Sequence, residues 1–70
     1  MNSSTMVWLN GAQESLGKGQ TIASLLLAKK INPASVVVEL NTEIVQKEAY
    51  GTTVLKNSDS VEVLHFVGGG

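Results

Sequence analysis

The residues best placed to do chemistry are the last three of the sequence, Gly68, Gly69 and Gly70. Glycine has no side chain and adopts almost any backbone conformation, so a run of glycines can pass through a narrow channel. If residues 66–70 are extended, they reach about 17 Å beyond the preceding strand. We expect a flexible tail at 68–70 that carries the carboxylate of Gly70 into another protein's active site. The alternative is a frayed end, because chain termini are often disordered.

A carboxylate becomes an acyl donor only when one of its oxygens is made a leaving group, and attack on the α-phosphate of ATP would do this. That step needs magnesium and cationic groups. The sequence has neither a phosphate-binding glycine loop nor a cluster of metal ligands, and Gly17-Lys18-Gly19 has only the pattern of a turn. We therefore expect a chain that binds no cofactor or metal and has no catalytic residues, with ATP and magnesium used by an adenylating partner.

Composition narrows the function further. The sequence has no cysteine, which excludes disulfides, thiolate metal sites and a side-chain persulfide, so any sulfur it carries must sit on another group. Its five cations are all lysines and its net charge is −1, which argues against nucleic-acid binding. The apolar runs are too short to span a bilayer and the N-terminus lacks a signal pattern, so we expect a cytoplasmic protein without membrane contact.

The first half of the sequence predicts a hairpin and a helix. Residues 6–9 and 12–16 read as strands joined by Asn10-Gly11, a pair that favours a tight turn with two positive φ angles. Thr21 then precedes apolar residues spaced i, i+3 and i+4, so it should cap a helix that runs to about Lys30. Pro33 follows, where a helix cannot continue.

The second half predicts strands without another helix. The β-branched run 36–40 reads as a strand, 44–45 as a shorter one and 61–67 as the last. Between them, Val54-Leu55 should dock into the core, and a turn should follow at 57–60.

This order predicts an α+β fold of the ubiquitin-like β-grasp type, a mixed sheet of four to five strands with one helix packed on one face. A ferredoxin-like fold would need a second amphipathic helix, for which residues 46–50 are too few. We expect a disordered leader at 1–5, the β-grasp domain at 6–67 and the glycine tail at 68–70.

Alternation along the strands divides the sheet into two faces. The residues expected to face the helix are Val7, Leu9, Val36, Val38, Leu40, Val61 and Val63. On the opposite face we expect a partner-docking surface, to which Glu39 and Glu62 add charge. Its four members are Trp8, Val37, Leu64 and Phe66. The alternative is that a small protein leaves some apolar surface in contact with water.

Two other residues have structural interpretations. His65 is the single histidine and lacks neighbours for metal binding or acid–base work, so we expect it at the core edge, partly buried. Tyr50 should cover the irregular segment with its ring inward.

From Met6 to Gly70 the sequence resembles the ThiS family, the sulfur carriers of thiamine thiazole synthesis. The resembling segments are VWLNG, TIASLLL, VVVELNTEIV, TVL and the final VEVLHFVGGG. The family often has an acidic residue where this chain has Ser24, and an Asp-Gly-Asp turn where it has Asn57-Ser58-Asp59. We expect these departures to affect capping and turn geometry and not the tail.

The resemblance implies a cycle. A ThiF-like adenylyltransferase activates Gly70, a sulfur donor such as a cysteine desulfurase or a rhodanese-type protein converts it to a thiocarboxylate, and thiazole synthase takes the sulfur. Because a thiocarboxylate holds the sulfur on the backbone terminus, this cycle is compatible with a chain that has no cysteine. Three alternatives share the predicted fold: the small subunit of molybdopterin synthase, a ubiquitin-like protein modifier and a plain interaction module.

Overall fold

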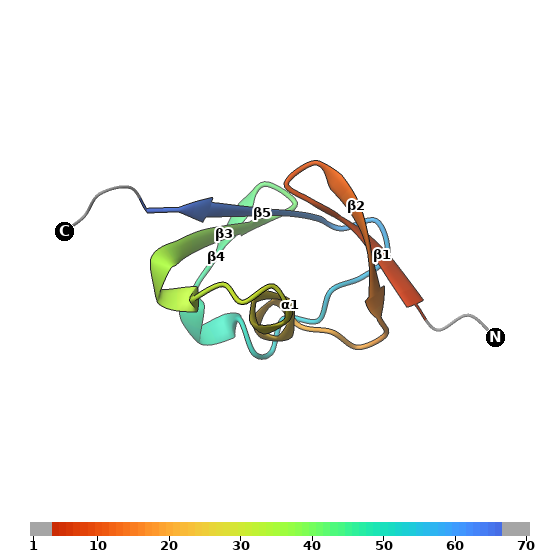
Figure 1. Cartoon of the computed structure of the whole chain (residues 1–70), viewed down its shortest axis with the longest axis horizontal. Coiled ribbons are helices and arrows are strands. Elements are labelled where there is room, and N and C mark those ends of the chain that lie inside the picture. Colours follow the sequence, from red (N-terminus) through yellow and green to blue (C-terminus); the bar gives the residue numbers. More distant parts are fainter. Residues whose placement is uncertain (1–3, 67–70) are drawn as a thin grey trace.

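The computed structural model describes residues 4–66, which form a five-stranded sheet, one α-helix and two short 3₁₀ helices (Figure 1). In chain order the elements are β1 (Ser4–Leu9), β2 (Ala12–Gly17), α1 (Ile22–Ala28), η1 (Pro33–Ser35), β3 (Val36–Leu40), β4 (Glu43–Val45), η2 (Lys47–Ala49) and β5 (Ser60–His65). The strand order is β2-β1-β5-β3-β4, with β1 parallel to β5 and the other pairs antiparallel. This is the mixed sheet with one helix that the sequence predicts.

The hairpin of β1 and β2 forms at the predicted turn. Asn10 has a φ of 50° and Gly11 a φ of 84°, as a two-residue hairpin loop requires. Strand β1 begins at Ser4, two residues before the predicted start of the domain, because Ser4 and Thr5 pair with the far end of β2. Residues 4 and 5 therefore belong to the sheet, and residues 1–3 of the expected leader lie outside the described residues.

Helix α1 begins as predicted and ends early. The Thr21 hydroxyl oxygen accepts a hydrogen bond from the Ser24 amide (3.1 Å), and the Ser24 hydroxyl oxygen accepts one from the Thr21 amide (2.8 Å). This is a capping box in which a serine does the work usually done by a glutamate. The helix ends at Ala28 and not near Lys30.

The early end has a backbone cause. Lys30 has a φ of 59°, its amide donates to the Leu27 carbonyl, and the Ile31 amide reaches back to the Leu26 carbonyl. These two bonds form a Schellman motif, which normally has glycine at the position of Lys30. Because the usual glycine is absent, the sequence does not reveal this stop.

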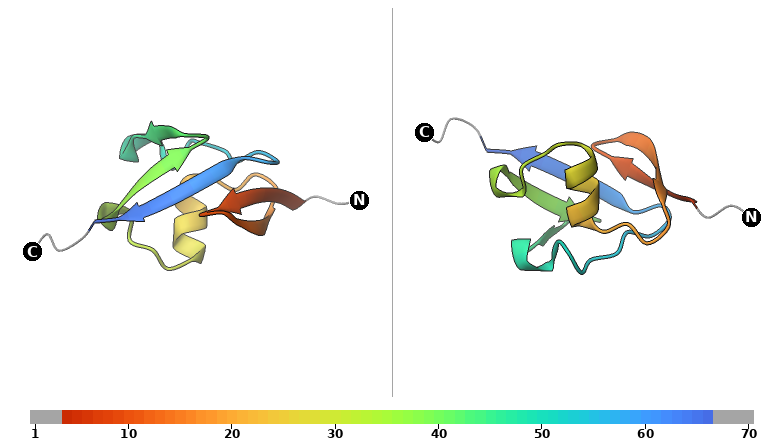
Figure 2. Two further views of the ribbon diagram at one scale, coloured as in Figure 1. Left: turned by 90° about the horizontal axis from the view of Figure 1, so that it is seen from above. Right: turned by 60° about the horizontal axis from the view of Figure 1, so that its bottom comes forward.

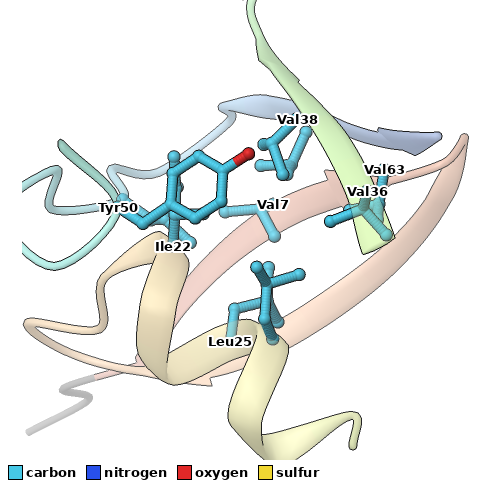
Figure 3. Packing of buried hydrophobic residues seen from close by; sticks show 10 residues of the cluster. Val7, Ile22, Leu25, Val36, Val38, Tyr50 and Val63 are labelled. Carbon is cyan, nitrogen blue, oxygen red and sulfur yellow. The ribbon is translucent and has the colours of Figure 1, made fainter. Parts of the chain in front are cut away.

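The core lies between α1 and one face of the sheet (Figures 2 and 3). All the strand residues predicted to face the helix are buried except Leu9 and Leu40, which are partly buried and pack against the core. The helix contributes Ile22, Leu25 and Leu26, each at most 2% exposed. Within the described residues no polar or charged side chain is buried, so the core is held by apolar packing alone.

The long segment between β4 and β5 closes the core beside the start of the helix. Tyr50 and Leu55 are buried, as predicted, whereas Val54 is 48% exposed and stays outside. The carbonyls of Tyr50 and Thr53 accept hydrogen bonds from the Ala23 and Ile22 amides. These two amides lie in the first helical turn and would otherwise lack partners, so the segment also stabilises the helix start.

Candidate functional site

The end of β5 is held on both of its edges. On the β3 edge, the Phe66 amide donates to the Ser35 carbonyl (3.0 Å). On the other edge, β1 pairs only with Ser60 and Val61, and the side chain of Asn10 continues the ladder. Its Oδ1 accepts from the Val63 amide (2.8 Å) and its Nδ2 donates to the Val63 carbonyl (3.4 Å). The path of the chain is therefore set by the sheet as far as Phe66.

Lys47 adds a side-chain contact at the same place. Its Nζ lies 5.6 Å from the centroid of the Phe66 ring and donates to the Val36 carbonyl (3.3 Å). A lysine over an aromatic face is attracted by the ring quadrupole. Lys47 therefore ties η2 to the last described residue before the glycines.

The predicted last strand, 61–67, extends too far, because β5 (Ser60–His65) ends before Phe66. Phe66 keeps its hydrogen bond to Ser35 but lies beyond the strand. Val67 and the glycines Gly68, Gly69 and Gly70 lie outside the described residues, so their expected roles remain predictions.

Figure 2 (left) shows the face of the sheet away from α1, which we call the open face. Strand register and alternation with buried neighbours place on it the four residues predicted to form a docking surface. Val37 lies directly opposite Leu64, and Phe66 is the next residue after Leu64 on that side. Trp8 lies opposite Ser60, so Glu62 separates it from Leu64 along β5. The fold brings three of the four together and leaves Trp8 at the other end of the face.

Sequence reasoning missed two residues beside this group. Ile44 is 62% exposed and lies opposite Glu39, which places it on the open face. Alternation along β4 could have found it, but no sequence pattern indicates the position of Lys47. Ile44, Lys47 and Val37 line a pocket of about 240 Å³. We call Val37, Ile44, Leu64 and Phe66 the apolar patch.

Glu39 and Glu62, which we call the acidic pair, lie directly opposite each other on β3 and β5. They occupy the row between Val37 and Leu64 on one side and Trp8 on the other, and Ile44 lies beside Glu39 in the same row. Glu39 is half-buried and Glu62 is exposed. A group that docks on the open face would therefore meet apolar surface on one side, two carboxylates in the middle and an indole ring on the other.

His65 is exposed, so the prediction that it is partly buried is wrong. Its partner is Val36, the first residue of β3, so it lies at the end of the ladder. Residues 4–66 contain no group of three or more potential ligands that could hold a metal ion. In the same range, no helix has the length and hydrophobicity needed to cross a membrane.

The fold and the site together define a small ubiquitin-like β-grasp protein with an exposed apolar patch next to the strand that leads into its glycines. A solved structure, the thiamine biosynthesis protein ThiS from Geobacter metallireducens, matches with a TM-score of 0.82 and 35% identity, covering 94% of this chain and 100% of that one. The model of the ThiS family matches residues 7–70. The chain belongs to the ThiS family.

Curated relatives are of two kinds. The sulfur carrier protein ThiS of Bacillus subtilis is 41% identical over 66 residues, which cover 93% of this chain and all of that protein. Thiazole synthases from Magnetococcus marinus and Paramagnetospirillum magneticum are 39% and 32% identical, over 91% and 89% of this chain. The chain spans only about a fifth of the length of these two synthases, 20% and 19%.

Proposed function

We propose that this chain is a sulfur carrier of thiamine biosynthesis and that the terminal carboxylate of Gly70 carries the sulfur. The observation that supports it most is the 41% identity to a sulfur carrier protein ThiS over that protein's whole length. The family match also runs through Gly70. This match does not favour the small subunit of molybdopterin synthase or a protein modifier.

The chemistry proceeds in two steps on Gly70. A carboxylate oxygen attacks the α-phosphate of ATP and displaces pyrophosphate, which leaves an acyl-adenylate. Hydrosulfide, released from the donor's persulfide by a thiol reductant that is oxidised to a disulfide, then attacks the acyl carbon, and AMP leaves with the oxygen. The product is a thiocarboxylate, whose sulfur is a better nucleophile than a carboxylate oxygen and can be passed to the thiazole precursor.

The chain contributes a carrier and not a catalyst in this proposal. A ThiF-like adenylyltransferase provides the magnesium, the ATP site and the cationic groups, and the sulfur donor is a cysteine desulfurase or a rhodanese-type protein. Thiazole synthase is the acceptor, and the related segments in two thiazole synthases support that choice. We place the cycle in the cytoplasm, where ATP is available.

The geometry of the described residues suits this role in one specific way. Hydrogen bonds to Ser35 and Asn10 hold β5 on both edges, and Lys47 lies over Phe66. A partner that docks on the apolar patch therefore has a fixed reference point next to the residues that must reach its active site. When docking fixes the orientation of the tail before the reaction, the entropic part of the activation barrier becomes smaller.

Intact mass spectrometry tests the proposal. The chain is incubated with an adenylyltransferase of the ThiF type, ATP, magnesium and sulfide, and we expect the mass gain of one oxygen replaced by one sulfur, on Gly70. Removing Gly69 and Gly70 should abolish both this gain and pyrophosphate release. Conversion of the shortened chain, or heavier conjugates in place of the exchange, would contradict the proposal.

A bulky residue in the tail should act on the reaction and not on the fold. We expect Gly69→Phe to lower pyrophosphate release more than about a hundredfold, because a side chain there would block a narrow channel, with unchanged thermal unfolding. Gly51→Phe is the matched control, because a Cβ atom added at Gly51 meets no atom within 4 Å and a larger side chain can extend from it into open space. Equal release by the two variants would count against threading.

A further inference from the structure

The acidic pair is arranged in a way that costs the free domain stability. Glu39 and Glu62 are a directly opposite cross-strand pair, and their chain neighbours Val38 and Val63 are buried, so both carboxylates lie on the open face. Side chains in such a pair have Cβ atoms about 5 Å apart, and like charges there repel. Within residues 4–66 the ion pair is Lys29–Glu14, so neither member of the acidic pair has a cationic partner in this range.

The surroundings of the acidic pair indicate what could neutralise it. Val37 and Leu64 form the next row of the sheet, and Ile44 flanks Glu39 on β4. Trp8 is 41% exposed and lies opposite Ser60, the residue two positions before Glu62 on β5. Glu62 is therefore a diagonal neighbour of Trp8, within reach of its aromatic side chain. The two carboxylates thus lie between an aliphatic surface and an indole.

We propose that the open face binds a surface of thiazole synthase that places an arginine guanidinium between Glu39 and Glu62 and against the ring of Trp8. The inference rests on the proposed function, which supplies thiazole synthase as the partner. The relatives favour this partner, because two thiazole synthases contain a segment related to this chain.

A guanidinium fits this site better than an ammonium. It is planar, it offers separate N–H groups to two carboxylates, and its face stacks on an aromatic ring. The apolar patch, once covered, excludes water from the charged contact and strengthens it. The two carboxylates repel each other in the free domain, and only a partner that places a cation between them gains a favourable interaction. Proteins that lack this cation bind less well, so the acidic pair contributes to specificity.

Neutralising the acidic pair tests the proposal, because binding and stability should change in opposite directions. We expect Glu39→Gln with Glu62→Gln to raise the Kd for the thiazole synthase of the same organism about 10- to 100-fold, measured by calorimetry. The melting temperature of the free variant should stay the same or rise, because the repulsion is gone.

Glu14→Gln with Glu43→Gln is the matched control. It removes the same charge, but Glu14 lies opposite Val7 and Glu43 lies opposite Leu40, so both are on the other face of the sheet. This control should bind within about twofold of the unaltered chain. Equal binding by the two double variants would overturn the proposal, and so would weaker binding that comes with a lower melting temperature.

The guanidinium is tested from the synthase side. We expect one surface arginine of the synthase whose Arg→Lys change weakens binding of the unaltered chain but has little further effect on the Glu39→Gln, Glu62→Gln variant, the pattern of a coupled pair. If no arginine behaves in this way, the assignment is wrong. A binding loss confined to the adenylyltransferase would equally contradict the choice of partner.

Failure here is distinguishable from failure of the proposed function. The adenylation rate of Gly70 at saturating carrier, followed by pyrophosphate release, should be the same for the double variant and the unaltered chain. If the unaltered chain is never adenylated, the proposed function is wrong. If it is adenylated and the double variant binds the synthase normally, only the inference about the acidic pair is wrong.

Discussion

The face of the sheet that α1 covers is lined by valines that are at most 4% exposed, whereas the open face mixes exposed apolar side chains with two opposed carboxylates. On the covered face the buried valines pack against the helix, and their removal from water stabilises the free domain. On the open face, Phe66 is 59% exposed and the acidic pair is repulsive. The difference teaches that the covered face specifies the fold and that the open face is suited to a partner.

This comparison predicts that substitutions on the two faces should affect different measurements. A change on the covered face should lower stability and should affect binding only through unfolding. A change on the open face should lower binding and leave stability nearly unchanged.

The largest expected effect is on the covered side. Leu26→Ala should lower the free energy of unfolding by about 2–5 kcal/mol, because Leu26 is fully buried and its loss leaves a cavity. Denaturation by urea measures the loss. Leu27→Ala, one residue along and 78% exposed in the unaltered chain, should cost less than about 0.5 kcal/mol. Equal losses would mean that the helix packs differently from the arrangement in Figure 3.

The second expected effect is on binding. Leu64→Asp should weaken partner binding more than about tenfold by placing a charge in the apolar patch, while stability falls by less than about 1 kcal/mol. Val54→Asp is the matched control, because both residues are 48% exposed and Val54 lies outside the open face. Titration of both variants with the adenylyltransferase and the synthase decides the matter. A similar loss of affinity for Val54→Asp would remove the distinction between the two surfaces.

The smallest expected effect concerns Asn10, which ties β5 to the hairpin. Asn10→Gly keeps the positive φ but loses both bonds to Val63, and should cost about 1 kcal/mol of stability. Asn10→Ala should cost more, since alanine also disfavours a φ of 50°. Thermal unfolding compares the two variants. If glycine proved the more harmful, the cost of a positive φ for alanine would be smaller than the chain entropy that glycine adds to the unfolded state.

Much of the fold could be predicted because its signals are local. The Asn10-Gly11 turn, the cap at Thr21 and the i, i+3, i+4 spacing of the helix each depend on residues within a few positions of one another. The period-two pattern of the strands sorted Val36 and Val38 from Val37 correctly. The ends of elements were less predictable, since the helix stops at a Schellman motif with lysine in place of glycine, and β1 starts where β2 offers a partner.

The candidate site was only partly predictable for the same reason. Alternation places Trp8 and Leu64 on one face, but only strand pairing shows that Glu62 separates them. The contact of Lys47 with Phe66 joins residues far apart in the chain, and no local pattern contains it.

The sequence by itself determined the order of the elements, which side of each element is apolar, and the position of the glycines at 68–70. These features depend on side-chain type and short-range geometry. The tertiary structure alone decided that Glu39 would oppose Glu62, that Asn10 would complete the edge of β5, and that Ile44 would join the apolar patch. Strand register sets these relations, and register is chosen by the packing of the whole core.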